Sequence, residues 1–329
     1  MMMKFPRRKF LHLAASAAAL PAVSRIANAQ TYPARPIHLI VGFAAGGAMD
    51  VNARLMGQWL SERLGQQFVI ENRTGAGGNI ATEAVVRASP DGYTLLTCGT
   101  ANAVNASLYV KLDFNFIRDI APVAGLVRLP LVLIVHPSVP PKTAAEFIAY
   151  AKANAGKVYY ASPGSGTSVM MSAELFRIMT NIPLPGVTYR GLNGGGYTDM
   201  ISGRVQITFD NLPGSIGYIR NGQFGALGVT TKARSDQLPD VPSISDAVPG
   251  YEASAFYGLN AAKGTPPEIV DKLNKAVNAG LADPVMKGKL ANLGGMMMPG
   301  TPGEFGKMLA AETDKWAKVI REANIKLMD

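Results

Sequence analysis

The chain has 329 residues, 32 of them Lys or Arg and 23 Asp or Glu, which gives a formal net charge of +9 at pH 7. Apolar residues make up 48% and charged residues only 17%, a balance that excludes a disordered protein. The single cysteine, Cys98, excludes cysteine-based zinc and iron–sulfur sites. Three histidines exclude a multi-histidine metal centre, so no cofactor is expected.

Residues 1–29 have the pattern of an export signal. A basic start, MMMKFPRRKF, precedes the apolar stretch LHLAASAAALPAV, and ANA at 27–29 fits a cleavage site of the A-x-A type. Arg7 and Arg8 resemble the twin-arginine export motif, although Pro6 stands where that motif usually has Ser or Thr. Five of the nine excess positive charges belong to this segment. No later segment is apolar over the roughly 20 residues that a membrane-spanning helix needs. We therefore expect a soluble, only mildly basic protein in the bacterial periplasm.

Strand-like and helix-like segments alternate along the first part of the mature chain. Apolar runs predict strands, and apolar residues spaced by three and four predict helices. The expected strands are 37–41, 68–70 and 93–97, and the expected helices are 51–64 and 79–87. Strands separated by helices predict βαβ crossovers and a mainly parallel sheet.

The alternation restarts after the apolar run 131–135. Helices are expected at 143–153, 168–179 and around 196–202, and strands at 158–161, 186–189, 205–209 and 224–230. Residues 235–250 contain three prolines and are expected to form an irregular segment that crosses between the units. A strand is expected at 253–261 and helices over 265–329.

This order predicts an α/β protein of two domains, each a mainly parallel sheet flanked by helices. A mature chain of this length exceeds the usual size of a single core. If the C-terminal helices pack on the first unit, domain 1 is discontinuous, with residues 30–130 and 254–329, and domain 2 spans 131–253. Two hinge strands, near 129–136 and 253–261, would then connect domains that close on a ligand at the carboxyl ends of their strands.

Two glycine-rich segments, GFAAGG at 42–47 and SPGSGTS at 162–168, each join a strand to a helix. The first does not have the spacing of a dinucleotide-binding or P-loop motif. Backbone N–H groups at a helix N-terminus suit a carboxylate, and for this first loop a tight turn without a ligand is the alternative. Ser165 is not in a G-x-S-x-G elbow, which leaves a serine hydrolase without support. Asp210 ends a strand and could accept a hydrogen bond from a ligand, or it could simply begin a turn.

Together with these loops, several further segments resemble the Bug (TctC-like) substrate-binding proteins of tripartite tricarboxylate transporters. The resemblance covers residues 32–329 and is carried by GFAAGGAMDVNAR (42–54), ENRTGAGGNIATEAVVRASPDGYTLL (71–96), YASPGSGT (160–167), LPDVPSISDA (238–247) and TPPEIVDKLNKAV (265–277). It implies a type II periplasmic binding protein, or Venus flytrap, without catalysis. Such a protein would be a monomer that binds a small carboxylate and delivers it to a two-subunit membrane permease. Basic patches with interleaved aromatic residues are absent, which argues against a nucleic-acid partner.

The resemblance also implies a set of ligand-binding residues and no metal ligand. They are Phe43, Ala45, Gly46 and Gly47 in the first loop, Ala101, Asn102 and Asn105 in a loop at 101–105, Ser162, Gly166, Thr167 and Ser168 in the second loop, and Arg190 and Asp210.

The sequence departs from the family pattern at three places. Met170 stands where the family often has His, Asn102 replaces a frequent His, and 191–199 contains an extra residue. We therefore do not transfer the ligand of a typical member, and expect that a less polar pocket around Met170 accepts an aromatic or longer aliphatic acid. Two other functions stay open. One is an exported hydrolase or isomerase that uses Ser165, or Asp210 with Arg190. The other is a ligand sensor for a signalling receptor, without transport.

Overall fold

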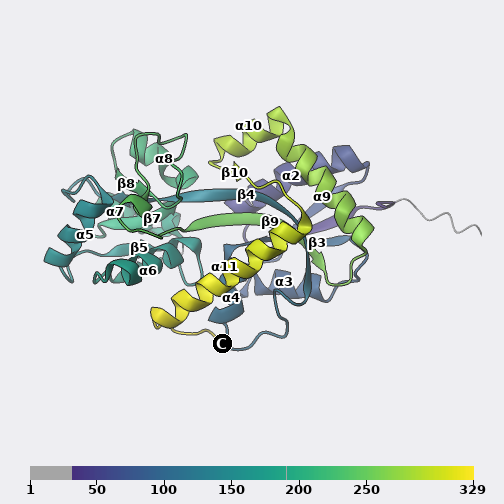
Figure 1. Ribbon diagram of the computed structural model, residues 1–329, viewed down its shortest axis with the longest axis horizontal. Helices are drawn as coiled ribbons and strands as arrows, with labels where there is room; N and C mark the ends of the chain where they lie inside the picture. The colour runs from purple at the N-terminus through teal and green to yellow at the C-terminus, as the bar shows by residue number, and fades with distance from the viewer. Residues whose placement is uncertain (1–31, 190) are drawn as a thin grey trace, which may run out of the picture.

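The computed structural model describes residues 32–189 and 191–329 (Figure 1). The predicted export signal at 1–29 and the predicted ligand contact Arg190 lie outside the described residues. The chain has a mixed α/β fold, in which one continuous sheet runs through two lobes in the strand order β2-β1-β3-β9-β4-β7-β5-β6.

The first lobe contains three parallel strands, and the central one, β1, pairs with both others. Each strand is followed by a helix, as the alternating sequence pattern predicts. The strands are β1 (Ile37–Val41), β2 (Phe68–Asn72) and β3 (Thr94–Gly99). The helices are α2 (Ala48–Leu64), α3 (Asn79–Val86), preceded by a 3-10 turn at Ala76–Gly78, and α4 (Thr100–Leu108). The expectation of a loop at 101–105 was wrong, because these residues form α4.

Two long strands, β4 (Ile120–Val135) and β9 (Ser254–Ala262), connect the lobes. Residues 120–130 of β4 pair with β9, and residues 131–135 pair with two strands of the second lobe. Every antiparallel pair in the sheet involves β4 or β9, and the remaining pairs are parallel. The sequence predicted only the end of β4, because Pro122 and Gly125 suggest a break. The strand accommodates them with register shifts at both places.

The second lobe contains short strands covered by four helices. The strands are β5 (Tyr160–Ser162), β6 (Gly186–Thr188), β7 (Ile207–Asn211) and β8 (Gly225–Val229). The helices are α5 (Ala144–Ala153), α6 (Ser168–Thr180), α7 (Gly196–Ile201) and α8 (Leu212–Arg220), with 3-10 turns at Leu192–Gly194 and Ile244–Asp246. Helix α8 was missed because its LPG start reads as a turn, although proline is tolerated at the first helical positions.

The C-terminal segment forms α9 (Pro267–Ala282), α10 (Pro284–Asn292), β10 (Met296–Met297) and α11 (Pro302–Glu322). Helix α11 begins at a capping box of Thr301 and Glu304. It crosses the front of the sheet from the first lobe to α6 of the second (Figure 1). Its apolar face, which includes Trp316, is buried in a core shared with both lobes.

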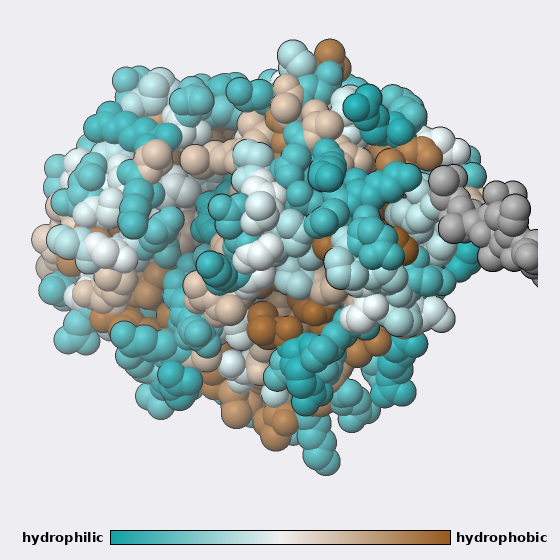
Figure 2. Space-filling model, turned by 45° about the vertical axis from the view of Figure 1, so that its right-hand side comes forward, coloured by the Kyte–Doolittle hydropathy of each residue, from teal (hydrophilic) through white to brown (hydrophobic). Residues whose placement is uncertain are grey.

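Cys98 is buried in β3, as a small apolar residue would be. The face drawn in Figure 2 is mostly hydrophilic, with apolar residues gathered in small groups between polar ones. In residues 32–189 and 191–329, no helix combines the length and the apolar character needed to cross a membrane.

Candidate functional site

Four helices point their N-termini into one cavity between the lobes, of about 260 Å³. We call it the four-helix pocket. Helices α2 and α4 come from the first lobe, α6 and α8 from the second, and the hinge strand β9 supplies a further wall. The lining residues are Phe43, Gly47, Ala48, Met49, Thr100, Ala101, Pro163, Thr167, Ser168, Val169, Asn211, Ala255 and Tyr257.

The convergence follows from the topology of the sheet. Each of the four helices starts at the carboxyl end of the strand before it: β1 leads to α2, β3 to α4, β5 to α6 and β7 to α8. Strands β1 and β3 are parallel, and so are β5 and β7, so within each lobe these strands end at the same edge. Open α/β sheets bind ligands at that edge.

The N-terminus of α2 has free backbone donors. The first hydrogen bond of the helix joins the Val51 N–H to the Gly47 carbonyl at 2.9 Å, and Gly47 has no side chain to cap the N–H groups in between. Those of Ala48 and Met49, which line the pocket, have no partner four residues earlier in the helix. They can therefore donate to an anion in the pocket.

Asp50 stabilises the loop before α2 rather than facing the pocket. Its buried carboxylate accepts from the Gly46 N–H at 2.8 Å, from Arg54 Nε at 2.8 Å and from Asn72 Nδ2 at 2.9 Å. Burial alone would raise the pKa of Asp50, but these hydrogen bonds outweigh it and hold the pKa below its usual value. Gly46 has a φ of 79°, a conformation that favours glycine.

The N-terminus of α6 is arranged in the same way in the second lobe. Thr167 Oγ1 accepts from the Met170 N–H at 3.3 Å and donates to the Gly164 carbonyl at 2.8 Å. The N–H groups of Ser168 and Val169 have no partner four residues earlier, and both residues line the pocket. A carboxylate between α2 and α6 could thus accept from backbone donors of both lobes.

Helices α4 and α8 complete the pocket with neutral polar groups. Thr100, the first residue of α4, is 4% exposed, and its hydroxyl accepts from the Phe256 N–H of β9 at 3.2 Å. Asn211, which precedes α8, has a buried Oδ1 without a hydrogen-bond partner among the described residues. Among those residues, no Lys or Arg side chain lines the pocket.

Five of the predicted ligand-binding residues line the four-helix pocket: Phe43, Gly47, Ala101, Thr167 and Ser168. The others, apart from Arg190, do not. Ala45 and Gly46 are exposed in the first loop, and Gly166 packs against Leu108 of α4.

The remaining predicted side chains have partners elsewhere. Asn102 Oδ1 accepts from the Gly99 N–H at 2.8 Å, and Asn105 Nδ2 donates to the Gly77 carbonyl at 3.0 Å. Ser162 is buried, and its Oγ accepts from the Gly164 N–H at 3.3 Å.

Asp210 is buried behind Asn211 and accepts a hydrogen bond from the Tyr197 hydroxyl. Burial raises the pKa of Asp210 to about 6, against the lowering effect of the hydrogen bond from Tyr197. Met170, around which a less polar pocket was expected, lines a different hollow together with Ser165. The apolar walls of the four-helix pocket come instead from Phe43, Met49 and Val169.

Sequence reasoning missed eight lining residues: Ala48, Met49, Thr100, Pro163, Val169, Asn211, Ala255 and Tyr257. Ala48, Met49 and Val169 lie next to residues that were predicted, and Asn211 follows Asp210. Ala255 and Tyr257 lie in a predicted hinge strand, but the sequence does not indicate which face of that strand meets the ligand.

Among residues 32–189 and 191–329, the candidate catalytic groups lie apart from the pocket. Ser165 is exposed, His38 contacts Glu71, and His136 contacts Ser138 Oγ at 2.7 Å. Within the part of the chain that the structure describes, no three His, Cys, Asp or Glu residues are placed to hold a metal ion.

Comparison with known proteins gives consistent matches. A family model described as "Tripartite tricarboxylate transporter family receptor" matches residues 52–325. The chain is 35% identical to protein BugT of Bordetella pertussis over 303 residues, which are 91% of this chain and 93% of the relative. It is 33% identical to a UPF0065 protein of Cupriavidus necator over 322 residues, 96% of this chain and 97% of the relative.

Solved structures match over nearly the whole described chain. R. palustris Rpa4515, solved with adipate, has a TM-score of 0.80 at 36% identity and covers 90% of this chain and 100% of its own. The periplasmic binding protein BugD has a TM-score of 0.77 at 30% identity, with coverage of 90% and 100%. MatC from Rhodopseudomonas palustris, solved with bound malate, has a TM-score of 0.75 at 31% identity, with coverage of 88% and 100%.

Proposed function

The chain belongs to the tripartite tricarboxylate transporter receptor family, and we propose that it binds a small carboxylate in the four-helix pocket and delivers it to a membrane permease. Proteins of this family are periplasmic binding proteins. The solved relatives are solute-binding proteins, and we propose no catalytic step for this chain.

The observation that carries the proposal is the meeting of four helix N-termini at one cavity. Each N-terminus places partial positive charge at the pocket, and an anion near it gains about 0.3–1 kcal/mol, or about 2 kcal/mol where partly buried. The Ser168 hydroxyl adds a side-chain donor at the start of α6, whereas the hydroxyl hydrogens of Thr100 and Thr167 are already directed at the Ser254 and Gly164 carbonyls. Neutral donors suit a ligand that must be released again, because they bind a carboxylate without a strong ion pair.

The size and walls of the pocket limit the ligand. A volume of about 260 Å³ lies at the small end of ligand sites. Phe43, Met49 and Val169 provide apolar contacts for a short hydrocarbon chain between polar ends. Adipate and malate, the acids found with two relatives, are of this kind, and we propose ligands of the same class.

We further propose that the lobes are separate domains, with residues 30–130 and 254–329 in one and 131–253 in the other. A carboxylate that accepts from α2 and α6 together binds the closed arrangement more tightly than the open one. This difference in affinity would shift the equilibrium towards closure. The closed monomer would then dock on the two-subunit permease in the periplasm.

A thermal-shift screen of the mature protein tests the proposal. The screen uses adipate, malate, benzoate and glutamate, each compared with the amide in which its carboxylates are neutralised. A true ligand at a hundredfold excess over its dissociation constant stabilises the protein by about 2.7 kcal/mol, and its amide does not. Recovery of a chemically altered acid would favour an enzyme instead.

A further inference from the structure

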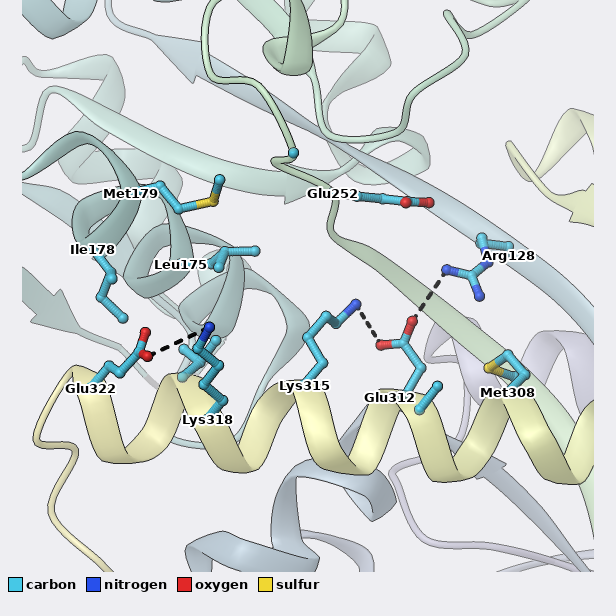
Figure 3. Close-up of a pocket in the computed structure, with 13 residues that line it drawn as sticks. Arg128, Leu175, Ile178, Met179, Glu252, Met308, Glu312, Lys315, Lys318 and Glu322 are labelled. Carbon is cyan, nitrogen blue, oxygen red and sulfur yellow. Dashed lines mark hydrogen bonds and ion pairs between the residues drawn. The ribbon is translucent and has the colours of Figure 1, made fainter.

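A second cavity, of about 530 Å³, lies between α6 and α11, on the side of the sheet that α11 covers (Figure 3). Side chains alternate between the two faces of a strand. Ala255 and Tyr257 line the four-helix pocket, so Ser254 and Phe256 face the other way. Phe256 accordingly lies in the same buried cluster as Trp316 of α11. The α6–α11 cavity and the four-helix pocket are therefore on opposite faces of one short segment, residues 254–257.

Arg128 of β4 lines the α6–α11 cavity and is held there by two acceptors. Its Nη1 donates to Ser254 Oγ at 2.7 Å and to Glu312 Oε1 of α11 at 3.3 Å. Lys315 Nζ lies 2.7 Å from the other oxygen of Glu312 (Figure 3). The side chains of Arg128 and Glu312 are only 21% and 8% exposed, so solvent screens this ion pair less than a surface pair.

Ser254 links this ion pair to the four-helix pocket. Its carbonyl lies 3.4 Å from the hydroxyl of Thr100, which lines the pocket and accepts from the Phe256 N–H at 3.2 Å. Ser254 and Thr100 are 1% and 4% exposed. The contacts Arg128–Ser254–Thr100 therefore run through the hinge strand from one cavity to the other.

We propose that Arg128 is a positioning residue for the four-helix pocket. By holding Ser254, it fixes β9 at the point where the strand leaves the second lobe, and with it Ala255 and the first turn of α4. Arg128 touches no ligand in this account; it acts through Ser254 and Thr100. The inference rests on the proposed function, because it takes the four-helix pocket as the ligand site.

Two substitutions interrupt the contacts at different places. Ser254→Ala removes only the Oγ acceptor, and Arg128→Met removes the guanidinium while Glu312 keeps Lys315. Ser243→Ala is the matched control. Ser243 is also buried, at 4% exposure, and its Oγ donates to the Thr231 carbonyl at 2.7 Å, but it lines neither cavity.

The first measurement is the dissociation constant for adipate by titration calorimetry. Losing one or two hydrogen bonds should raise it about fivefold in Ser254→Ala and about tenfold in Arg128→Met, with less than about a twofold change in Ser243→Ala. Because both substitutions act through the same contact, the double variant should bind like Arg128→Met alone. Unchanged constants in both single variants, or effects that multiply in the double variant, would overturn the proposal.

The second measurement needs no ligand. Amide hydrogen exchange should become faster at 254–257 and 100–103 in Ser254→Ala and Arg128→Met, and stay unchanged there in Ser243→Ala. Unchanged exchange in these segments would overturn the proposal by itself. If the wild-type protein binds no carboxylate, the proposed function fails, and the exchange result still decides whether Arg128 positions the pocket.

Discussion

The hydroxyl of Tyr197 donates a hydrogen bond to the buried carboxyl of Asp210, next to the pocket residue Asn211. Tyr197 also packs against Tyr218 of α8, with ring centroids 4.8 Å apart, and no ion pair joins Asp210 to a cation among the described residues. The second lobe therefore has a buried carboxyl group without an ion-pair partner in the described part of the chain, next to the four-helix pocket.

This carboxyl predicts a pH dependence of stability. Burial raises the pKa of Asp210 from 3.8 to about 6, so folding favours its protonated form. The resulting stabilisation is complete below the unfolded pKa and is lost as the pH rises through about 6, with a total of about 3 kcal/mol. Asp210→Asn should therefore gain stability relative to wild type as the pH rises from about 3.8 to about 6 in urea unfolding, and the difference should level off above that. Parallel pH curves for the two proteins would contradict this assignment.

Thr167→Val should weaken ligand binding and lower stability. The substitution removes both hydrogen bonds of the hydroxyl that caps α6, which costs about 1 kcal/mol in unfolding free energy. The dissociation constant for adipate should rise about fivefold, because the lost cap no longer holds the Ser168 and Val169 N–H donors in place and about 1 kcal/mol corresponds to that factor.

The matched control for Thr167→Val is Thr143→Val. Thr143 caps α5 in the same way, accepting from the Glu146 N–H at 3.2 Å, far from the pocket. Thr143→Val should therefore lose a similar unfolding free energy and keep its affinity for adipate. Equal affinity in both variants would show that the Thr167 cap does not position the donors of the pocket.

Gly46→Ala should lower affinity through the backbone. A Cβ at Gly46 would meet no atom within 4 Å, so it causes no steric clash. The substitution instead strains the backbone, because alanine disfavours a φ of 79° by about 1 kcal/mol. Relieving that strain moves the donors at the start of α2. Gly156→Ala is the matched control. Gly156 has a φ of 75° and equally open space around its Cα, but it does not line the pocket. Calorimetry should show weaker adipate binding only in Gly46→Ala, and an equal loss in both variants would point to general instability.

Ala101→Leu should fill part of the four-helix pocket. Three added carbons occupy space that a ligand chain would otherwise use, so adipate affinity should fall at least tenfold while the smaller malate loses less. The unfolding free energy should change little, since the side chain enters a cavity. A loss of stability with unchanged affinity for both acids would place the ligand elsewhere.

Much of the fold was predictable because the alternation of strands and helices follows from short, local patterns. The extent of β4 was not, since its pairing with β9 accommodates Pro122 and Gly125 through contacts far away in the sequence. Helices α4 and α8 were missed because each begins next to a residue type that is common in loops. Gly99 precedes α4, and Pro213 lies in the first turn of α8.

The candidate site was predicted in part for the same reason. The glycine loops before α2 and α6 indicate open helix N-termini, and Gly47 and Thr167 do line the pocket. Asn105 looked equally suitable, but its partners Gly77 and Asn79 lie more than twenty residues away in the chain and come near only through folding. The face of β9 that carries Ala255 is likewise set by tertiary packing.

The most direct measurement is titration calorimetry of the mature protein with adipate and with its uncharged diamide. If four helix N-termini hold a carboxylate, adipate or malate binds with one site per chain, and the diamide gives no heat of binding. Equal binding of acid and diamide, or no binding of any small carboxylate, would contradict the central claim.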